Sequence, residues 1–141
     1  MTTRLSCMVF SSGEWQQSHS LKHWRYSHCS WGVEGGVVLL GGYDSRDTSE
    51  VVTTHGDQGV PGPPLQHHTA WACSIADLVS ETVVVTGGVE TRKTVTRYGM
   101  VGFVEDLPSL EEGRYGHGCG AYLRYDGLTQ VVSREGVTVL I

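Results

Sequence analysis

Apolar residues along this chain occur in short runs that glycine and polar residues separate. Four runs rich in Val, Thr and Tyr show the pattern, at residues 36–40, 50–54, 82–86 and 93–98. Short runs of β-branched and aromatic residues between turn-forming residues are typical of β-strands. No window of about a dozen residues carries the apolar spacing of an amphipathic helix, and the closest stretch, residues 73–80, is better explained as a strand. The pattern therefore predicts an all-β protein built from short strands.

A sequence motif recurs along the chain with a spacing near 45 residues. Arg25-Tyr-Ser-His-Cys29 returns as Arg114-Tyr-Gly-His-Gly-Cys119, and Ala70-Trp-Ala-Cys73 lies between them. The copies that begin at Arg25 and Ala70 are each followed by an apolar run that ends in a diglycine, Gly41–Gly42 and Gly87–Gly88 respectively. Recurrence at a fixed period is the signature of a repeat architecture, in which each unit is stable only when stacked on its neighbours.

This combination of an apolar run ending in Gly-Gly, a later aromatic and Leu, and then Arg-x-x-His resembles the kelch repeat. The resemblance covers about residues 15–132. It implies an all-β, partial kelch-type β-propeller with about two and a half four-stranded antiparallel blades in an incomplete ring. The residues that it makes structural are Trp15, His28, Gly41, Gly42, Gly87, Gly88, Tyr98, Phe103 and His117.

The repeat divides the chain into four parts. Residues 1–24 are expected to end a preceding blade, with an outer strand near Trp15 to Leu21; residues 25–69 and 70–113 are two blades; residues 114–141 are an incomplete or altered third blade. The position of a third diglycine is occupied by Ser133 and Arg134. Because propellers need roughly four to eight blades, we expect a fragment, a truncated product or a partial ring completed by other material, with self-association through unpaired blade edges.

The charge balance of the chain is acidic. Ten Lys and Arg residues against 15 Asp and Glu residues give a formal net charge of −5. Nucleic acid is not expected as a partner, because its binders carry a basic patch. The chain has no run of about 18 apolar residues that could span a membrane, and residues 5–10 are too short for the apolar region of a signal peptide. No membrane partner is expected, and the cytoplasm is favoured while the localisation stays open.

Cys29, Cys73 and Cys119 share one position of the repeat. Three small buried apolar residues are the expected explanation; a disulfide between neighbouring blades is the alternative, which requires Cα atoms within about 7 Å. His67 and His68 with Cys73 form the closest cluster of metal-ligand types, but they lack the spacing of a structural zinc site. We expect no metal and no cofactor.

Two pairs of carboxylates, Glu105–Asp106 and Glu111–Glu112, flank residues 107–110. Glycosidases use two carboxylates, but exposed acidic residues of a surface connection explain these pairs better. The chain also lacks the fingerprints of a nucleophile elbow, a phosphate-binding loop or a zinc protease. The sequence therefore predicts no catalytic residues and no enzyme.

Loops on a rigid scaffold are where recognition residues collect. Residues 43–48 and 89–93 follow the diglycines and should be equivalent loops, and residues 22–26, 66–68 and 111–115 form a second equivalent set. Tyr and Arg are among the residue types that dominate interface energies. The expected partner-binding residues are Arg25, Tyr26, Tyr43, Asp44, Arg46, Asp47, His67, His68, Glu90, Arg92, Lys93, Glu111, Glu112, Arg114 and Tyr115.

The sequence thus predicts a noncatalytic kelch-type interaction module, or a fragment of one, that binds a protein or peptide through its loops. This function follows from fold analogy. One alternative is a fragment of a kelch-propeller enzyme such as a copper radical oxidase, for which Tyr98, Tyr115 and His117 supply the residue types of metal ligands. Another is a truncated product with no activity of its own.

Overall fold

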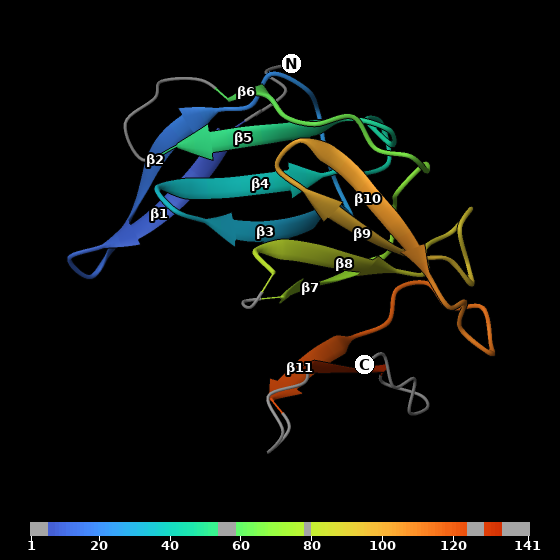
Figure 1. Ribbon diagram of the computed structural model, residues 1–141. Helices are drawn as coiled ribbons and strands as arrows, with labels where there is room; N and C mark the ends of the chain where they lie inside the picture. The colour runs from blue at the N-terminus through green and yellow to red at the C-terminus, as the bar shows by residue number, and fades with distance from the viewer. Residues whose placement is uncertain (1–5, 54–58, 78–79, 124–128, 134–141) are drawn as a thin grey trace.

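The protein is built from β-strands (Figure 1). The computed structural model describes residues 6–53, 59–77, 80–123 and 129–133. Within these ranges there is no helix, and so none that is long and apolar enough to cross a membrane. The predicted positions Thr54 and Arg134 lie outside the described residues. The strands are β1 Ser6–Ser11, β2 Glu14–Ser20, β3 Cys29–Val33, β4 Gly36–Leu40, β5 Ser49–Thr53, β6 Val60–Pro61, β7 Cys73–Asp77, β8 Thr82–Thr86, β9 Val95–Gly99, β10 Gly102–Leu107, β11 Cys119–Leu123 and β12 Thr129–Ser133.

The strands form four antiparallel sheets, each of which pairs strands that are consecutive in the sequence. Two sheets have four strands, in the orders β3-β4-β5-β6 and β7-β8-β9-β10, and two sheets are hairpins, β1-β2 and β11-β12. The all-β, antiparallel prediction is therefore confirmed. None of the described sheets is closed or curled into a propeller, so the propeller architecture stays a prediction.

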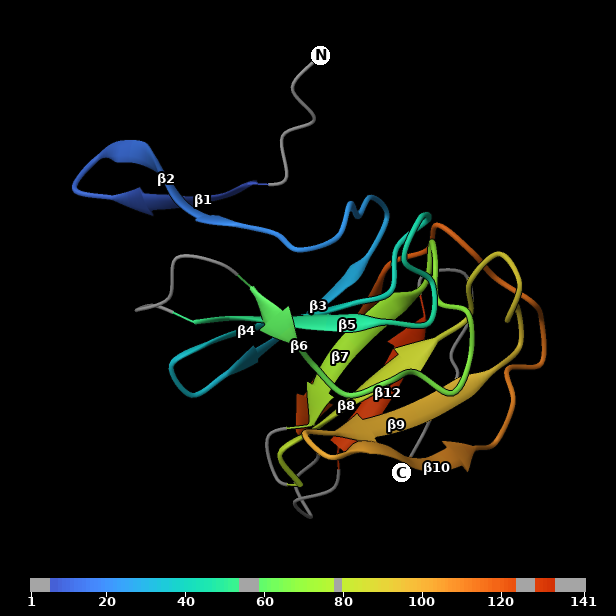
Figure 2. The same cartoon turned by 90° about the horizontal axis from the view of Figure 1, so that it is seen from above.

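The sheets are stacked so that their first strands are neighbours. β7 lies beside β3 on one side and beside β11 on the other (Figure 1). The Ser74 hydroxyl on β7 donates a hydrogen bond of 3.0 Å to the Ser30 carbonyl on β3. Figure 2 shows the β1-β2 hairpin standing away from this stack.

The main core lies between the two four-stranded sheets. Side chains alternate between the two faces of a strand, and β8 follows this rule: Val83 and Val85 face the first sheet, whereas Val84 belongs to a second cluster with Val95 and Leu110. Both faces of β8 are therefore buried, which explains its uninterrupted apolar run. The main cluster comprises Cys29, Trp31, Val38, Leu40, Leu65, Val83, Val85 and Tyr98.

The strands predicted at residues 36–40 and 82–86 are found at those residues, and the segment beginning at Cys73 is strand β7. The predictions at residues 50–54 and 93–98 are each displaced by one or two residues, since β5 begins at Ser49 and β9 at Val95. Glu105 and Asp106 belong to β10 and not to a surface connection, although both are exposed.

The expectation of three buried free cysteines is wrong for two of them. Cys73 on β7 and Cys119 on β11 form a disulfide with Cα atoms 6.1 Å apart. Cys29 is free and buried at the equivalent position of β3. Since β7 lies between β3 and β11, Cys73 has a cysteine-bearing strand on each side, and the bond is made to β11.

Candidate interaction surface

The loops that the sequence singled out lie together at one end of the sheets. In an antiparallel meander, successive connections alternate between the two ends of the sheet, so every second connection lies on the same side. The resulting loop face consists of residues 21–28, 41–48, 62–72, 87–94 and 108–118. Several of these loops project to the right in Figure 1.

The loop face is tied together by backbone hydrogen bonds that repeat from one unit to the next. Gly42 N–H donates to the Thr69 carbonyl at 2.7 Å, and Gly88 N–H donates to the Arg114 carbonyl at 2.8 Å. Two further bonds, from Trp71 N–H to Ser27 and from Gly116 N–H to Trp71, repeat in the same way. The sequence repeat is thus a repeat of contacts between neighbouring sheets.

Each diglycine makes this approach of two loops sterically feasible. Gly41 and Gly87 have φ angles of 66° and 65°, in the left-handed region that glycine adopts without strain. A Cβ atom on Gly41 would overlap the Thr69 carbonyl oxygen, and one on Gly87 would overlap that of Arg114. The two glycines are required both by the turn and by the loop packed against it.

Arg25 fixes one of these loops from inside. Its guanidinium donates to the carbonyls of Gly41 at 2.7 Å and Thr48 at 3.0 Å. Its Nη2 lies 3.5 Å from the Glu50 Oε1, and both side chains are fully buried. Burial lowers the pKa of Arg25, and the negative charge of Glu50 opposes that shift. Arg25 was expected to bind a partner, but its guanidinium is not exposed to one.

The Glu50 carboxylate that pairs with Arg25 also binds the backbone of the loop 21–28. It accepts hydrogen bonds from the backbone N–H groups of Lys22 and His23. A buried carboxylate is tolerated where a cation and N–H donors compensate its lost hydration. Glu50 cannot be recognised from the sequence alone, because an acidic residue at the start of a short strand resembles any exposed strand end.

Five aromatic side chains stand exposed on the loop face. They are Trp24, Tyr26, Tyr43, Trp71 and Tyr115, with exposed fractions between 37% and 57%. The rings of Tyr26 and Tyr43 are stacked, with centroids 5.1 Å apart. Trp24 and Trp71 were not among the expected binding residues, although each lies in or next to a predicted loop. Exposed aromatic residues of this kind are enriched where proteins bind one another.

Charged side chains connect the loops of different sheets on this face. Arg46 lies over the Tyr43 ring, with its guanidinium carbon 4.6 Å from the ring centroid, and forms an ion pair with Glu90. Glu90 also contacts the Nδ1 of His68 at 3.0 Å. Three loops, 41–48, 62–72 and 87–94, therefore meet at one carboxylate. Exposed ion pairs of this type add little stability, so their main effect is to orient the side chains.

The next unit repeats part of this arrangement. Arg92 of the loop 87–94 lies 5.5 Å from the centroid of the Tyr115 ring in the loop 108–118, whereas Arg46 and Tyr43 belong to one loop. Arg114, at the position equivalent to Arg25, is partly exposed and lies 3.8 Å from Glu112. Two Arg–Tyr contacts thus occur on the loop face, one within a loop and one between two loops.

The expected binding residues differ in their exposure. Arg46, His67 and Arg114 are partly exposed, Arg25 is buried, and His67 contacts Asp106 at 3.3 Å. The remaining expected residues are exposed: Tyr26, Tyr43, Asp44, Asp47, His68, Glu90, Arg92, Lys93, Glu111, Glu112 and Tyr115.

The residues expected to be structural occupy varied environments. Tyr98 is 1% exposed and packs edge-on against Phe103, and its hydroxyl accepts a hydrogen bond from Gln66 N–H at 3.2 Å. Trp15 pairs with Phe10 on the β1-β2 hairpin. The Nε2 of His117 forms a hydrogen bond of 2.9 Å with the Thr86 hydroxyl. His28, in the loop 21–28, is exposed overall, and its pKa is lowered by partial burial and by the charge of Arg25.

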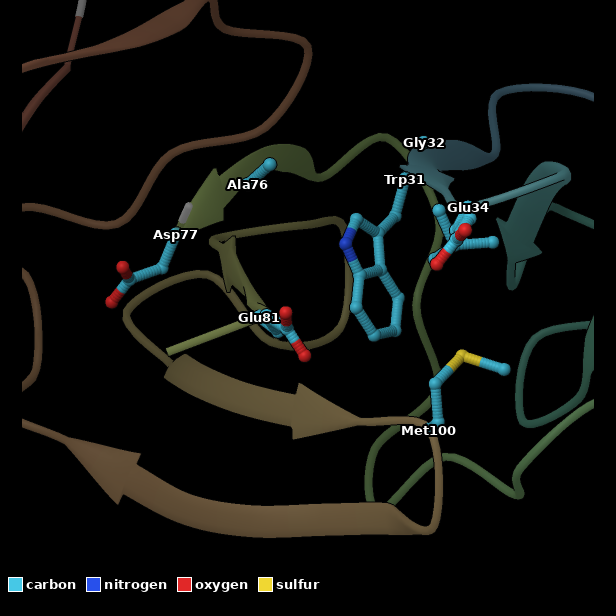
Figure 3. Close-up of a pocket in the computed structure, with 8 residues that line it drawn as sticks. Trp31, Gly32, Glu34, Ala76, Asp77, Glu81 and Met100 are labelled. Carbon is cyan, nitrogen blue, oxygen red and sulfur yellow. The ribbon is translucent and has the colours of Figure 1, made fainter. Parts of the chain in front are cut away.

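A pocket of about 520 Å³ lies at the opposite end of the sheets, near the turns after β3, β7 and β9 (Figure 3). We call it the turn pocket. Three carboxylates and one indole ring distinguish its wall, and Asp77 is engaged by Arg97 at 3.8 Å. Carboxylates beside an aromatic ring suit a cationic group. The lining residues are Trp31, Gly32, Val33, Glu34, Ala76, Asp77, Glu81 and Met100.

The sequence analysis did not predict the turn pocket, because its lining comes from turns of two different sheets and depends on how the sheets stack. Across the described ranges, no three His, Cys, Asp or Glu side chains gather as ligands for a metal ion. Tyr98 and Tyr115, named for the copper-enzyme alternative, differ in environment: Tyr98 is buried in β9, and Tyr115 is exposed on the loop face.

No family model and no curated protein matches the sequence.

Proposed function

We propose that the chain is a noncatalytic interaction module of the kelch type, and that its loop face binds a protein or peptide. The repeated diglycine contacts and the side-by-side first strands β3, β7 and β11 support a partial propeller, in which the two four-stranded sheets are blades. In such an architecture the loops at one end are the surface on which recognition residues collect.

The observation that carries the proposal is the exposed aromatic group on the loop face. Five Trp and Tyr side chains lie among loops that are themselves fixed by buried hydrogen bonds. Rigid aromatic side chains can bury large areas at low entropic cost, since little side-chain freedom is lost on binding. Arg46 and Arg92 add groups that can pair with carboxylates of a partner.

A random-peptide display library selected on the immobilised protein tests the proposal. We expect enrichment of a peptide consensus, and we expect Tyr43→Ala and Trp71→Ala each to weaken binding of that peptide by about tenfold or more, as for residues that dominate an interface. Glu81→Gln, in the turn pocket at the opposite end, is the matched control and should bind as the wild type does.

Two results would contradict the proposal. One is a selection that enriches no consensus. The other is a selected peptide whose affinity falls with Glu81→Gln and stays unchanged with Tyr43→Ala and Trp71→Ala, because binding would then belong to the turn pocket and its carboxylates.

A further inference from the structure

The two hairpins at the ends of the row of sheets are different halves of one four-stranded unit. The β1-β2 hairpin matches β9-β10, the last two strands of a complete sheet. In both hairpins an aromatic pair closes the turn: Phe10 is paired with Trp15, and Tyr98 with Phe103. The two rings of each pair are in contact, with centroids 5.3 Å and 6.5 Å apart.

The β11-β12 hairpin matches β7-β8, the first two strands of a complete sheet. Cys119 lies opposite Ser133 as Cys73 lies opposite Thr86, and both hairpins have five residue pairs in the same register. In the complete sheet, β8 pairs with β9 along its other edge. Within the described residues, β12 has β11 as its one sheet partner.

The apolar side chains of the β1-β2 hairpin are more exposed than the matching side chain of the β9-β10 hairpin. Tyr98 is 1% exposed, whereas Phe10 at the matching position is 59% exposed. Met8 and Trp15 on the same hairpin are also at least half exposed. Exposed apolar side chains that gather on one small element indicate a surface that binds a partner. In the complete sheet, Tyr98 is covered by side chains of β8 and of the neighbouring four-stranded sheet.

One molecule does not bring its two half-sheets together. The β1-β2 hairpin lies apart from β11-β12 in both views (Figures 1 and 2). Among the described residues, the first half of a sheet and the second half of another therefore lie apart, and a sheet edge that offers unpaired N–H and C=O groups is a template for pairing with another chain.

We propose that two copies of this chain associate head to tail, so that β12 of each copy pairs with β1 of the other. The described residues of each copy form two complete sheets, and with the two composite sheets the total for a dimer is about six, within the range of four to eight for closed propellers. One copy closing on itself would have about three sheets and three copies about nine, both outside that range. The proposal rests on the partial propeller proposed above.

The pairing of β8 with β9 predicts the register of the composite sheet. Val85 lies opposite Thr96, and Val83 lies opposite Tyr98. Transferring these positions to β12 and β1 places Val132 of one copy opposite Met8 of the other. Directly opposed residues of an antiparallel pair lie about 4.5–5.5 Å apart at Cα, within the range that a disulfide spans.

A mixing experiment with the full chain tests the register. Two variants that each add one cysteine, Met8→Cys and Val132→Cys, are made in a Cys7→Ser background, in which Cys29 is buried and Cys73 is bonded to Cys119, and are mixed before mild oxidation. We expect a covalent dimer on a non-reducing gel from the mixture and little from either variant alone. The mixture of Phe10→Cys with Val132→Cys, displaced by two residues, is the mismatched control and should cross-link several-fold less.

The mass in solution tests the association itself. Size-exclusion chromatography with light scattering on the wild-type chain should give twice 15.4 kDa. Phe10→Asp should shift the protein to the monomer mass while a cooperative unfolding transition remains, because it places a charge in the composite sheet. Val101→Asp, at a turn residue that is 97% exposed, should leave the dimer unchanged.

A monomer at tens of micromolar wild-type chain overturns the proposal, and so does an open series of higher oligomers, which would mean that the ring does not close. A dimer with equal cross-linking in the matched and mismatched mixtures overturns the assigned sheet. Because peptide binding at the loop face is measured separately with Tyr43→Ala, a monomer that still binds the selected peptide refutes the dimer and leaves the proposed function standing.

Discussion

Cys73 and Cys119 are covalently joined across two neighbouring sheets, and their separation of 46 residues equals the spacing of the two diglycines. The bond therefore links equivalent positions of successive units. It holds β11, and with it the last described hairpin, against β7.

Removing this disulfide should lower the free energy of unfolding substantially. A bridge that closes a loop of this length restricts the unfolded chain, and the chain-entropy relation gives about 4 kcal/mol. We expect Cys73→Ser/Cys119→Ser to lose roughly 2–4 kcal/mol in urea denaturation at a fixed protein concentration. Adding a reductant to the wild type should have a similar effect and should leave the double variant unchanged; an equal response of both proteins would contradict the prediction.

The bridge also bears on the compartment in which the protein works. Structural disulfides persist in oxidising environments and are rare in the cytosol. We therefore expect an oxidising compartment, against the cytoplasm that the sequence favoured. Trapping free thiols with an alkylating reagent in intact cells checks this, because Cys73 and Cys119 should be unlabelled where the bond is formed.

Breaking the Arg25–Glu50 pair should be costly because both side chains are completely buried. Glu50→Gln leaves the guanidinium without its counter-charge, and removing one partner of a buried pair costs about 3–5 kcal/mol. Chemical denaturation measures the loss. Arg46→Ala, which breaks the exposed pair with Glu90, is the control and should cost less than about 1 kcal/mol. Equal losses in the two variants would show that burial is not the cause.

How far the sequence predicts this fold depends on whether a feature is local. The apolar run Val83–Val85 predicts a strand, and Gly87–Gly88 predicts the turn that ends it. The structure has the strand and the turn at these residues. Val84 is buried on one face of β8, and Val83 and Val85 are buried on the other. Because both faces of the run are apolar, the strand can be predicted without knowing which face packs against the core.

The features that the sequence left open depend on distances between sheets. Cys73 has cysteine-bearing strands on both sides, so the repeat alone could not choose between Cys29, Cys119 and no bond at all. Glu50 is another example, since its role depends on Arg25 reaching across a loop far away in the sequence. The turn pocket is a third, because Trp31 and Glu81 come from different sheets.

Replacing Gly41 should separate steric overlap from backbone strain. Gly41→Ala places a Cβ into the Thr69 carbonyl at a φ of 66°. Gly35→Ala has a similar φ of 76° with nothing within 4 Å of the new Cβ. A left-handed non-glycine residue costs about 1–3 kcal/mol, so we expect about that loss at Gly35 and a clearly larger one at Gly41. Equal losses in thermal or urea unfolding would mean that the loop moves aside at no cost.

The stability of the protein should fall at alkaline pH through one buried thiol. Burial raises the pKa of Cys29 from 9.0 to about 11, and the side chain is 4% exposed. The unfolded chain loses this proton at a lower pH than the folded protein does. The contribution of Cys29 is therefore complete below pH 9 and is lost as the pH rises from about 9 to about 11, by roughly 3 kcal/mol for two pKa units.

Comparing the wild type with Cys29→Ala isolates this contribution from the tyrosines that titrate in the same range. Both proteins are unfolded in urea at pH 8, 9, 10 and 11, in a Cys7→Ser background. The difference between them should be constant up to about pH 9 and should then shift in favour of the alanine variant, because the variant has no thiol that ionises on unfolding. A difference that does not change with pH would mean that Cys29 titrates alike in both states, and hence that solvent reaches the thiol in the folded protein.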